Sequence, residues 1–231
     1  MAYEPSEEEQ VEAFKSWWRK NGVSVISGLV LAAVLSLGWQ YWQGQKELQA
    51  QRAGQVFAEM TVALESAETT NTEKKGPVAP DFQKPRALAE QLVGEFPDSL
   101  YAELATLNLA RMDIESQQAD AARARLEHLS EHAKNEAIRP LAKLRLAHLL
   151  WGTGQADAAL KTLEGFWPEA YRSDADALRG DILVSQARLD DARKAYDAAL
   201  AQATLLGLET GLLRIKRDDL GGASHATPAA Q

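Results

Sequence analysis

The most apolar part of the chain is a run near its amino end. Residues 23–42 read VSVISGLVLAAVLSLGWQYW, and no charged side chain occurs from Asn21 to Gln45. Twenty helical residues rise about 30 Å, which is the hydrocarbon thickness of a bilayer. Amphipathic aromatic rings, which favour the membrane–water interface, stand at both ends of the run: Trp17, Trp18, Trp39, Tyr41 and Trp42. The pattern predicts one membrane-spanning helix over residues 23–42.

A cleaved signal peptide is the alternative interpretation of this run, because Ser36 and Gly38 could supply the small residues of a processing site. A signal peptide has a short basic lead and an apolar region of about 7 to 15 residues. Here the lead is longer and carries several glutamates, and the aromatic cluster that follows Gly38 suits a retained anchor. We therefore favour the anchor.

The segment before the anchor, residues 1–22, is expected to be an amphipathic helix at the cytoplasmic membrane surface. Ser6 is followed three residues later by Glu9, the pattern of a capping box at a helix start. Val11, Phe14 and Trp18 then share one helical face. Such a helix either rests at the interface or serves as a short docking or degradation handle.

Lysines and arginines close to the anchor predict its orientation, because they favour the cytoplasmic side. Lys15, Arg19 and Lys20 precede the anchor, and Lys46 and Arg52 follow it. The basic residues of the amino side lie closer to the span. We therefore expect a single-pass type II protein of the inner membrane, with a cytoplasmic amino end and a periplasmic carboxyl-terminal domain.

The remaining chain predicts an all-α domain. Residues 43–68 continue the anchor helix outward, and residues 69–85, rich in proline and polar side chains, form a loop. Residues 86–217 alternate apolar and polar positions with helical spacing and show no strand pattern. Within them, Thr204 to Ile215 is expected to form one capping helix. Residues 218–231 form a disordered tail.

An internal repeat specifies how these helices are arranged. The string QADAA occurs at Gln118 and again at Gln155, 37 positions later, and RLDDA at Arg188 is a weaker third copy. Each copy ends in an alanine. A large residue stands four positions after this alanine, and a small residue stands twelve positions before it. The small residues are Ala110, Ala147 and Gly180, and the large residues are Leu126, Leu163 and Tyr196.

The repeat resembles the tetratricopeptide repeat, a helix–turn–helix unit of 34 residues. A small residue lets the first helix of each unit approach the second, and the large residue fills the remaining space. The units are divergent, because Asp113, Leu150 and Leu183 occupy the position where this repeat usually has tyrosine. The expected fold is a single transmembrane helix followed by a tetratricopeptide-repeat-like α-solenoid.

First helices of such units line the inner face of a solenoid, which commonly binds partners. On this basis the predicted partner-binding groove comprises Leu107, Arg111, Ile114, Leu144, His148, Trp151 and Asp181. Trp151 is the expected anchor, because tryptophan is enriched in binding hot spots. Its alternative role is to fill the junction between two repeat units.

Enzymatic chemistry finds little support. His128, Glu131 and His132 match the H-x-x-E-H string of some zinc hydrolases, but they fall on a repeat helix with no obvious third ligand. The chain has no cysteine nucleophile, glycine-rich phosphate loop or G-x-S-x-G string. We expect no cofactor, no metal and no small-molecule substrate. The net charge of −8 argues against nucleic acid as a partner.

Several phrases together resemble one family. The strings EQVEAFKSWWRKNG, GWQYWQ, QADAALKTLE and DALRGDILVSQ occur in order between Gln10 and Leu220. They are similar to the YfgM-type ancillary SecYEG translocon subunits of Gram-negative bacteria. The resemblance implies an inner-membrane protein that associates with the SecYEG translocon and with a PpiD-type membrane-anchored periplasmic chaperone, and that helps to pass secreted proteins to periplasmic chaperones. It implies no catalytic residue.

The favoured hypothesis is therefore a repeat adaptor held in the bilayer by one helix. A scaffolding role in another envelope complex is the first alternative, and a zinc hydrolase that uses His128, Glu131 and His132 is the second.

Overall fold

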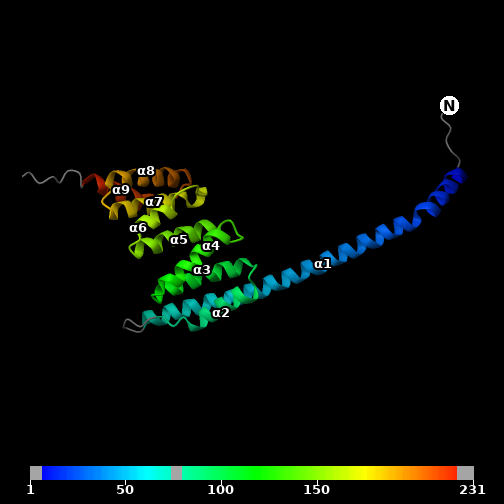
Figure 1. The fold of residues 1–231 in the computed structure, drawn as a ribbon, viewed down its shortest axis with the longest axis horizontal. Coiled ribbons are helices and arrows are strands. Elements are labelled where there is room, and N and C mark those ends of the chain that lie inside the picture. The colour runs from blue at the N-terminus through cyan, green and yellow to red at the C-terminus, as the bar shows by residue number, and fades with distance from the viewer. Residues whose placement is uncertain (1–6, 74–79, 223–231) are drawn as a thin grey trace, which may run out of the picture. The chain divides into compact units, whose positions relative to one another are not determined.

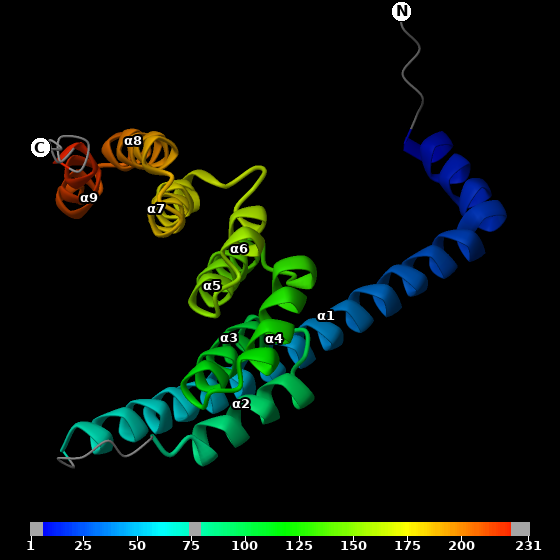
Figure 2. The same ribbon diagram turned by 60° about the vertical axis from the view of Figure 1, so that its left-hand side comes forward.

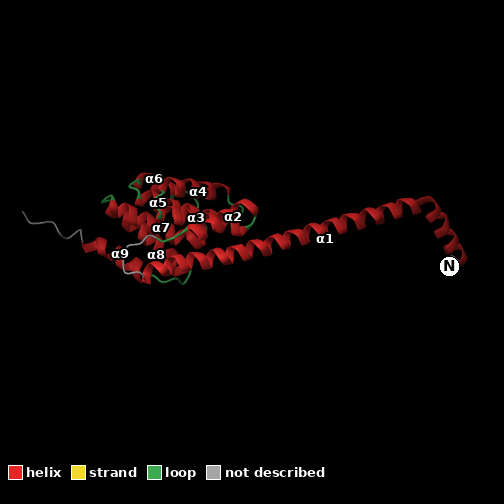
Figure 3. Cartoon of the chain, turned by 90° about the horizontal axis from the view of Figure 1, so that it is seen from below, coloured by secondary structure: helices red, strands yellow, loops and turns green. Residues whose placement is uncertain are grey.

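The structure is a computed structural model that describes residues 7–73 and 80–222. All regular elements in these two ranges are helices, with no strand (Figure 3). The helices are α1 (Glu7–Glu73), α2 (Gln83–Glu95), α3 (Leu100–Glu115), α4 (Ala119–His132), α5 (Ile138–Gly152), α6 (Ala156–Thr162), α7 (Glu169–Ser185), α8 (Leu189–Leu205) and α9 (Gly211–Gly222). The predicted all-α fold class is confirmed.

The chain divides into two compact units, Met1–Arg52 and Ala53–Gln231. In the first unit, α1 presents its apolar side chains outward: every large apolar residue from Val23 to Trp42 whose side chain is described is exposed. By length and composition this helix can cross a membrane. Lys46 places its ammonium group 3.5 Å from the centre of the Trp42 ring, a cation–π contact at the predicted interface.

In the second unit, helices α2 to α9 follow one another as a stack of antiparallel neighbours (Figures 1 and 2). The largest hydrophobic core lies between α3 and α7, and a smaller core joins α2 and α3 to the part of α1 that begins at Ala53. The small and large residues of the repeat are all buried, at no more than 2% exposure: Ala110, Leu126, Ala147, Leu163 and Tyr196, with Gly180 beside Tyr196.

The turns inside the three repeat units share one hydrogen-bonding pattern. In each, a residue in the left-handed region ends the first helix, and the next backbone N–H donates to a carbonyl five residues earlier, as in a Schellman motif. These bonds run from Gln118 to Asp113, from Gln155 to Leu150 and from Arg188 to Leu183, at 2.8, 2.8 and 2.9 Å. The left-handed residues are Gln117, Gly154 and Ala187, with φ of 60°, 80° and 58°.

Ala187→Gly is expected to stabilise the repeat domain by about 1 kcal/mol, because a left-handed conformation costs a residue with a Cβ about that much and costs glycine almost nothing. Thermal unfolding of the full-length protein in detergent, followed by circular dichroism, measures the difference. Gly154→Ala places a Cβ in the equivalent turn and should shift the midpoint in the opposite direction. An Ala187→Gly protein that unfolds at a lower temperature than the original contradicts this account of the turn.

The structure corrects the predicted capping helix. Thr204 to Ile215 does not form one helix: α8 ends at Leu205, and α9 begins at Gly211. Gly207 lies between them with a φ of 65°, and the Leu208 N–H donates to the Ala203 carbonyl at 2.9 Å. A glycine at this position ends a helix by the same Schellman geometry as the repeat turns, so the run of leucines is divided between two helices.

Three predicted boundaries also move. Helix α1 continues to Glu73 and α2 begins at Gln83, so the predicted loop over 69–85 is shorter at both ends, and residues 74–79 lie outside the described part of the chain. Helix α9 reaches Gly222, so the predicted disordered tail does not begin at residue 218, and residues 223–231 are likewise outside. Ser6, the first residue of the predicted capping box, is also outside the described ranges.

Candidate partner-binding groove

A groove lies among α3, α4 and α5, with a volume of about 580 Å³. Its floor is apolar and consists of side chains that are less than 10% exposed: Leu107, Ala110, Leu126 and Leu149. Ile114 also lines the groove and is 43% exposed. The charged or titratable side chains that line it are Arg111, Glu115, Arg145 and His148. This groove can accept an apolar side chain and place polar contacts around it.

The structure brings together some of the predicted groove residues. Leu107, Arg111, Ile114 and His148 line this groove, whereas Leu144, Trp151 and Asp181 do not. Leu144 packs, half-buried, against the main core. Asp181 accepts hydrogen bonds from the Tyr196 hydroxyl at 2.7 Å and from Lys216 Nζ at 2.8 Å.

Trp151 occupies the junction between two repeat units. Its ring packs, partly buried, against the main core, and its indole N–H donates to the Ser185 hydroxyl of α7 at 3.1 Å. This arrangement fits the alternative role considered for Trp151, that of joining units. We therefore move the expected partner contact from Trp151 to Ile114.

Arg111 is held by two carboxylates from different helices. Its Nε lies 2.8 Å from Glu115 Oε1 on α3, and its Nη2 lies 2.8 Å from Glu68 Oε1 on α1. Both pairs are partly exposed, so each contributes little to stability. They fix the direction of the guanidinium group beside the groove.

Arg145 is one of the groove residues that the sequence analysis missed. It lies one position after Leu144, which the usual repeat geometry assigned to the groove. The residues of α5 that line the groove are Arg145, His148, Leu149 and Gly152. Burial, followed by the positive charge of Arg111, lowers the pKa of Arg145. The signal that could have identified it is its spacing, because Arg145 lies three positions before His148, on the same helical face.

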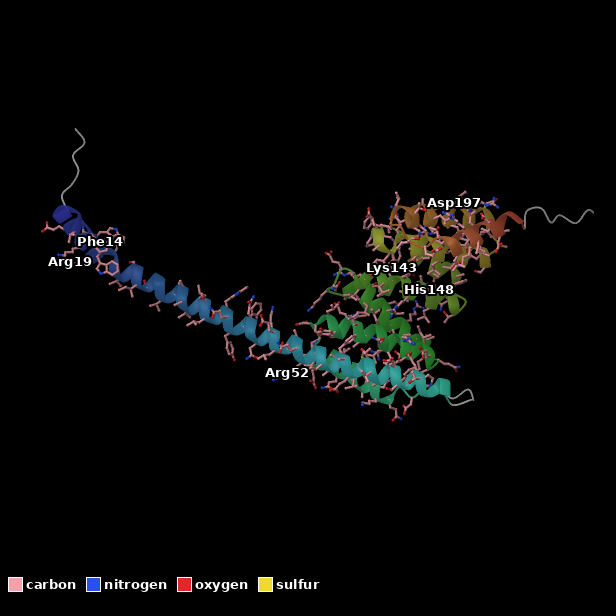
Figure 4. The ribbon with its side chains drawn as sticks, turned by 180° about the vertical axis from the view of Figure 1, so that it is seen from behind. Phe14, Arg19, Arg52, Lys143, His148 and Asp197 are labelled. Atoms are coloured by element: carbon pink, nitrogen blue, oxygen red, sulfur yellow. The ribbon has the colours of Figure 1, made fainter. Side chains whose placement is uncertain are left out.

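His148 lies on α5, as does Lys143 (Figure 4). Burial lowers the pKa of His148 below its usual value, and this effect outweighs the attraction of Asp181. The imidazole is therefore neutral at pH 7 and adds no positive charge to the groove.

The lowered pKa of His148 predicts a pH dependence of stability. Below about pH 6.5 the unfolded state binds a proton at this residue more readily than the folded state does, so stability falls as the pH drops. This loss of stability should level off at pH values below the pKa of His148 in the folded protein. Above pH 7 the imidazole is neutral in both states, so His148 should not make stability depend on pH there. Thermal unfolding between pH 7.5 and 5 should show a smaller decrease for His148→Gln than for the original protein. Parallel curves for the two proteins contradict the assignment.

The H-x-x-E-H string does not assemble a metal site in the described residues. The rings of His128 and His132 stack with their centres 4.9 Å apart, and the His132 Nδ1 atom lies 3.9 Å from Glu131 Oε2. Both histidines line a second cavity of about 450 Å³ together with Glu103. That carboxylate accepts from the backbone N–H groups of Lys134 and Asn135. Among residues 7–73 and 80–222, no three potential ligands converge.

Comparisons with known proteins agree with the repeat architecture. The family model described as tetratricopeptide repeat-like domain matches residues 15–222. A protein named ancillary SecYEG translocon subunit from Haemophilus influenzae is 29% identical over 95% of this chain and 100% of its own length. The protein of the same name from Escherichia coli is 30% identical over 84% of this chain and 87% of its own length. A third, from Neisseria gonorrhoeae, is 28% identical over 95% of this chain and 100% of its own.

Among solved structures, the crystal structure of BtubC (BKLC) from P. vanneervenii has a similar fold. The TM-score is 0.50, with 15% sequence identity over 74% of this chain and 84% of that chain. At this identity the likeness concerns the fold alone.

Proposed function

This chain belongs to the tetratricopeptide repeat-like family of ancillary SecYEG translocon subunits, and from that premise we propose that it is a membrane-anchored adaptor at the SecYEG translocon. The relatives are named as ancillary subunits of the SecYEG translocon, and this name supports a role beside the translocon. The α3–α5 groove is the observation that supports binding by the repeat domain: an apolar floor beside fixed charged groups suits a protein segment.

The anchor would confine the repeat domain to the membrane surface where the translocon lies. Tethering raises the effective concentration of the domain towards partners in the same membrane, so weak contacts suffice for association. The exposed apolar side chains of α1 support this role, because a surface of this kind is stable in lipid and unfavourable in water.

We further propose a cytoplasmic amino end and a periplasmic repeat domain, on the strength of Lys15, Arg19 and Lys20 before the anchor. The chain contains no cysteine, so single cysteines can be introduced cleanly. A membrane-impermeant maleimide added to spheroplasts should label Arg172→Cys on α7 and should label Glu12→Cys only after the membrane is opened. Labelling of Glu12→Cys but not Arg172→Cys in intact spheroplasts shows the opposite orientation.

The finer function proposed for the groove is to contact a PpiD-type membrane-anchored chaperone and so help to pass secreted proteins to periplasmic chaperones. A photoreactive residue at Ile114, illuminated in intact membranes, should capture such a chaperone. The same residue at Arg172, which is exposed and outside the groove, is the control. Equal capture from both positions, or from neither, would remove the groove from this proposal.

A further inference from the structure

We propose that the α3–α5 groove selects partner segments in which an apolar side chain stands next to a carboxylate, and that Arg145 binds this carboxylate. The inference rests on the proposed adaptor function and adds the chemistry of the bound segment. Three features support it: an arginine without a carboxylate partner among the described residues, a neighbouring arginine that already binds carboxylates, and an apolar floor in the same groove.

Arg145 is exposed at the groove, and its positive charge has little compensation. Its one hydrogen bond within the described residues goes to the Leu107 carbonyl at 3.5 Å, the limit for such a bond, and no carboxylate there lies within ion-pair distance. The Arg111 guanidinium adds repulsion, since it contributes to lowering the pKa of Arg145. Because the exposed Arg145 guanidinium has no carboxylate partner among the described residues, a carboxylate from a partner would gain a charge-assisted hydrogen bond here.

Arg111 shows that this part of the groove accepts carboxylates from a separate segment. Glu68 reaches it from α1, which is distant in sequence, and the pair is 2.8 Å apart. Glu115 holds the other side of the same guanidinium. Arg111 is therefore occupied, whereas Arg145 remains available. This difference makes Arg145 the residue expected to determine specificity.

The apolar floor supplies the second half of the recognition. Leu107, Leu126 and Leu149 form a surface less than 10% exposed at the base of the groove, and exposed Ile114 adjoins it. Burying one leucine of a partner on this floor provides affinity, while the carboxylate fixes its position. A peptide suits the site better than a fatty acid, because the Glu115 carboxylate beside the floor can accept hydrogen bonds from backbone N–H groups, which a fatty acid lacks.

The test uses full-length protein in nanodiscs of uncharged lipid at low salt. The probes are a fluorescein-labelled ten-residue peptide in which leucine alternates with glutamate, and the same peptide with glutamine in place of glutamate. Fluorescence anisotropy should give about tenfold tighter binding of the glutamate peptide. The net charge of −8 on the protein opposes this preference, so a general electrostatic attraction cannot produce it.

Arg145→Gln should reduce the preference to less than about twofold, and Arg145→Lys should retain part of it. Arg172→Gln is the matched control, because it removes an exposed arginine outside the groove and should leave the preference unchanged. Equal binding of the two peptides, or an unchanged preference in Arg145→Gln, overturns the proposal. Displacement of a fluorescent fatty acid by decanoate, with no peptide binding, overturns it in favour of a lipid.

The adaptor function is scored separately in the same variants. Crosslinking of the anchor to translocon subunits depends on α1 and not on Arg145, so it should persist in Arg145→Gln. If crosslinking persists while the peptides are not distinguished, the groove chemistry is wrong and the adaptor function stands. If crosslinking is absent from the original protein while the peptides are distinguished, the adaptor function is wrong and the groove chemistry stands.

Discussion

Gly180→Ala is expected to lower the free energy of unfolding of the repeat domain by about 3 kcal/mol. A Cβ at Gly180 on α7 would lie 2.5 Å from Cε1 of Tyr196 on α8, well inside van der Waals contact. The ring cannot move aside easily, because it is 2% exposed and its hydroxyl donates to Asp181 at 2.7 Å. Inside a helix alanine is otherwise preferred to glycine by about 1 kcal/mol. A loss of stability in Gly180→Ala therefore arises from the clash and not from helix propensity.

The other repeat units suggest how to relieve this clash. They pair alanine with leucine, as Ala147 with Leu163, where the third unit pairs Gly180 with Tyr196. In a Tyr196→Leu background, Gly180→Ala should therefore become neutral or stabilising. Chemical unfolding of the four proteins of this double-mutant cycle measures the coupling. A Gly180→Ala loss of equal size in both backgrounds would show that the two residues do not share one space.

Asp113→Ala is expected to cost about 3 kcal/mol, because it breaks an ion-pair network at a buried carboxylate. Asp113 on α3 is 1% exposed and lies 2.6 Å from Arg86 Nη1 on α2 and 2.9 Å from Arg125 Nε on α4. The two arginine side chains are 25% and 31% exposed, so without Asp113 they keep partly desolvated charges and no partner. The network thus joins three successive helices at the position where the repeat usually has tyrosine.

Asp191→Ala is the control for Asp113→Ala. Asp191 also contacts two basic residues, Arg188 at 2.9 Å and Lys194 at 3.3 Å, but it lies at the surface. Its removal should leave the unfolding midpoint unchanged within error. A similar loss for both substitutions, measured by thermal unfolding in detergent, would show that burial does not determine the contribution of Asp113.

Much of the fold could be predicted because its determinants are local. Twenty apolar residues between aromatic clusters identify the anchor, and the repeated QADAA string with its small and large partners identifies three helix pairs. The division of Thr204 to Ile215 was missed because the leucines continue with helical spacing through Gly207. Only the backbone shows that this glycine adopts a φ of 65° and ends the helix.

The residues predicted for the partner-binding groove line the cavity on α3, but on α5 only His148 does. Leu107, Arg111 and Ile114 line it as expected. Which residues of α5 line the groove depends on how far this helix is rotated about its axis relative to its neighbours, and that rotation is a property of tertiary packing. That rotation places Arg145 in the groove and Trp151 at the junction with α7. Repeat geometry taken from other proteins does not specify it to within one residue.

The most direct test of the membrane-anchored adaptor is site-specific photocrosslinking from the anchor in intact membranes. A photoreactive residue replaces Trp39, an exposed side chain near the end of the apolar run. The account predicts covalent adducts with subunits of the SecYEG translocon, which mass spectrometry identifies, and none when the same residue replaces Arg172 on α7. Adducts that contain only subunits of another envelope complex would contradict the account and favour the scaffolding alternative.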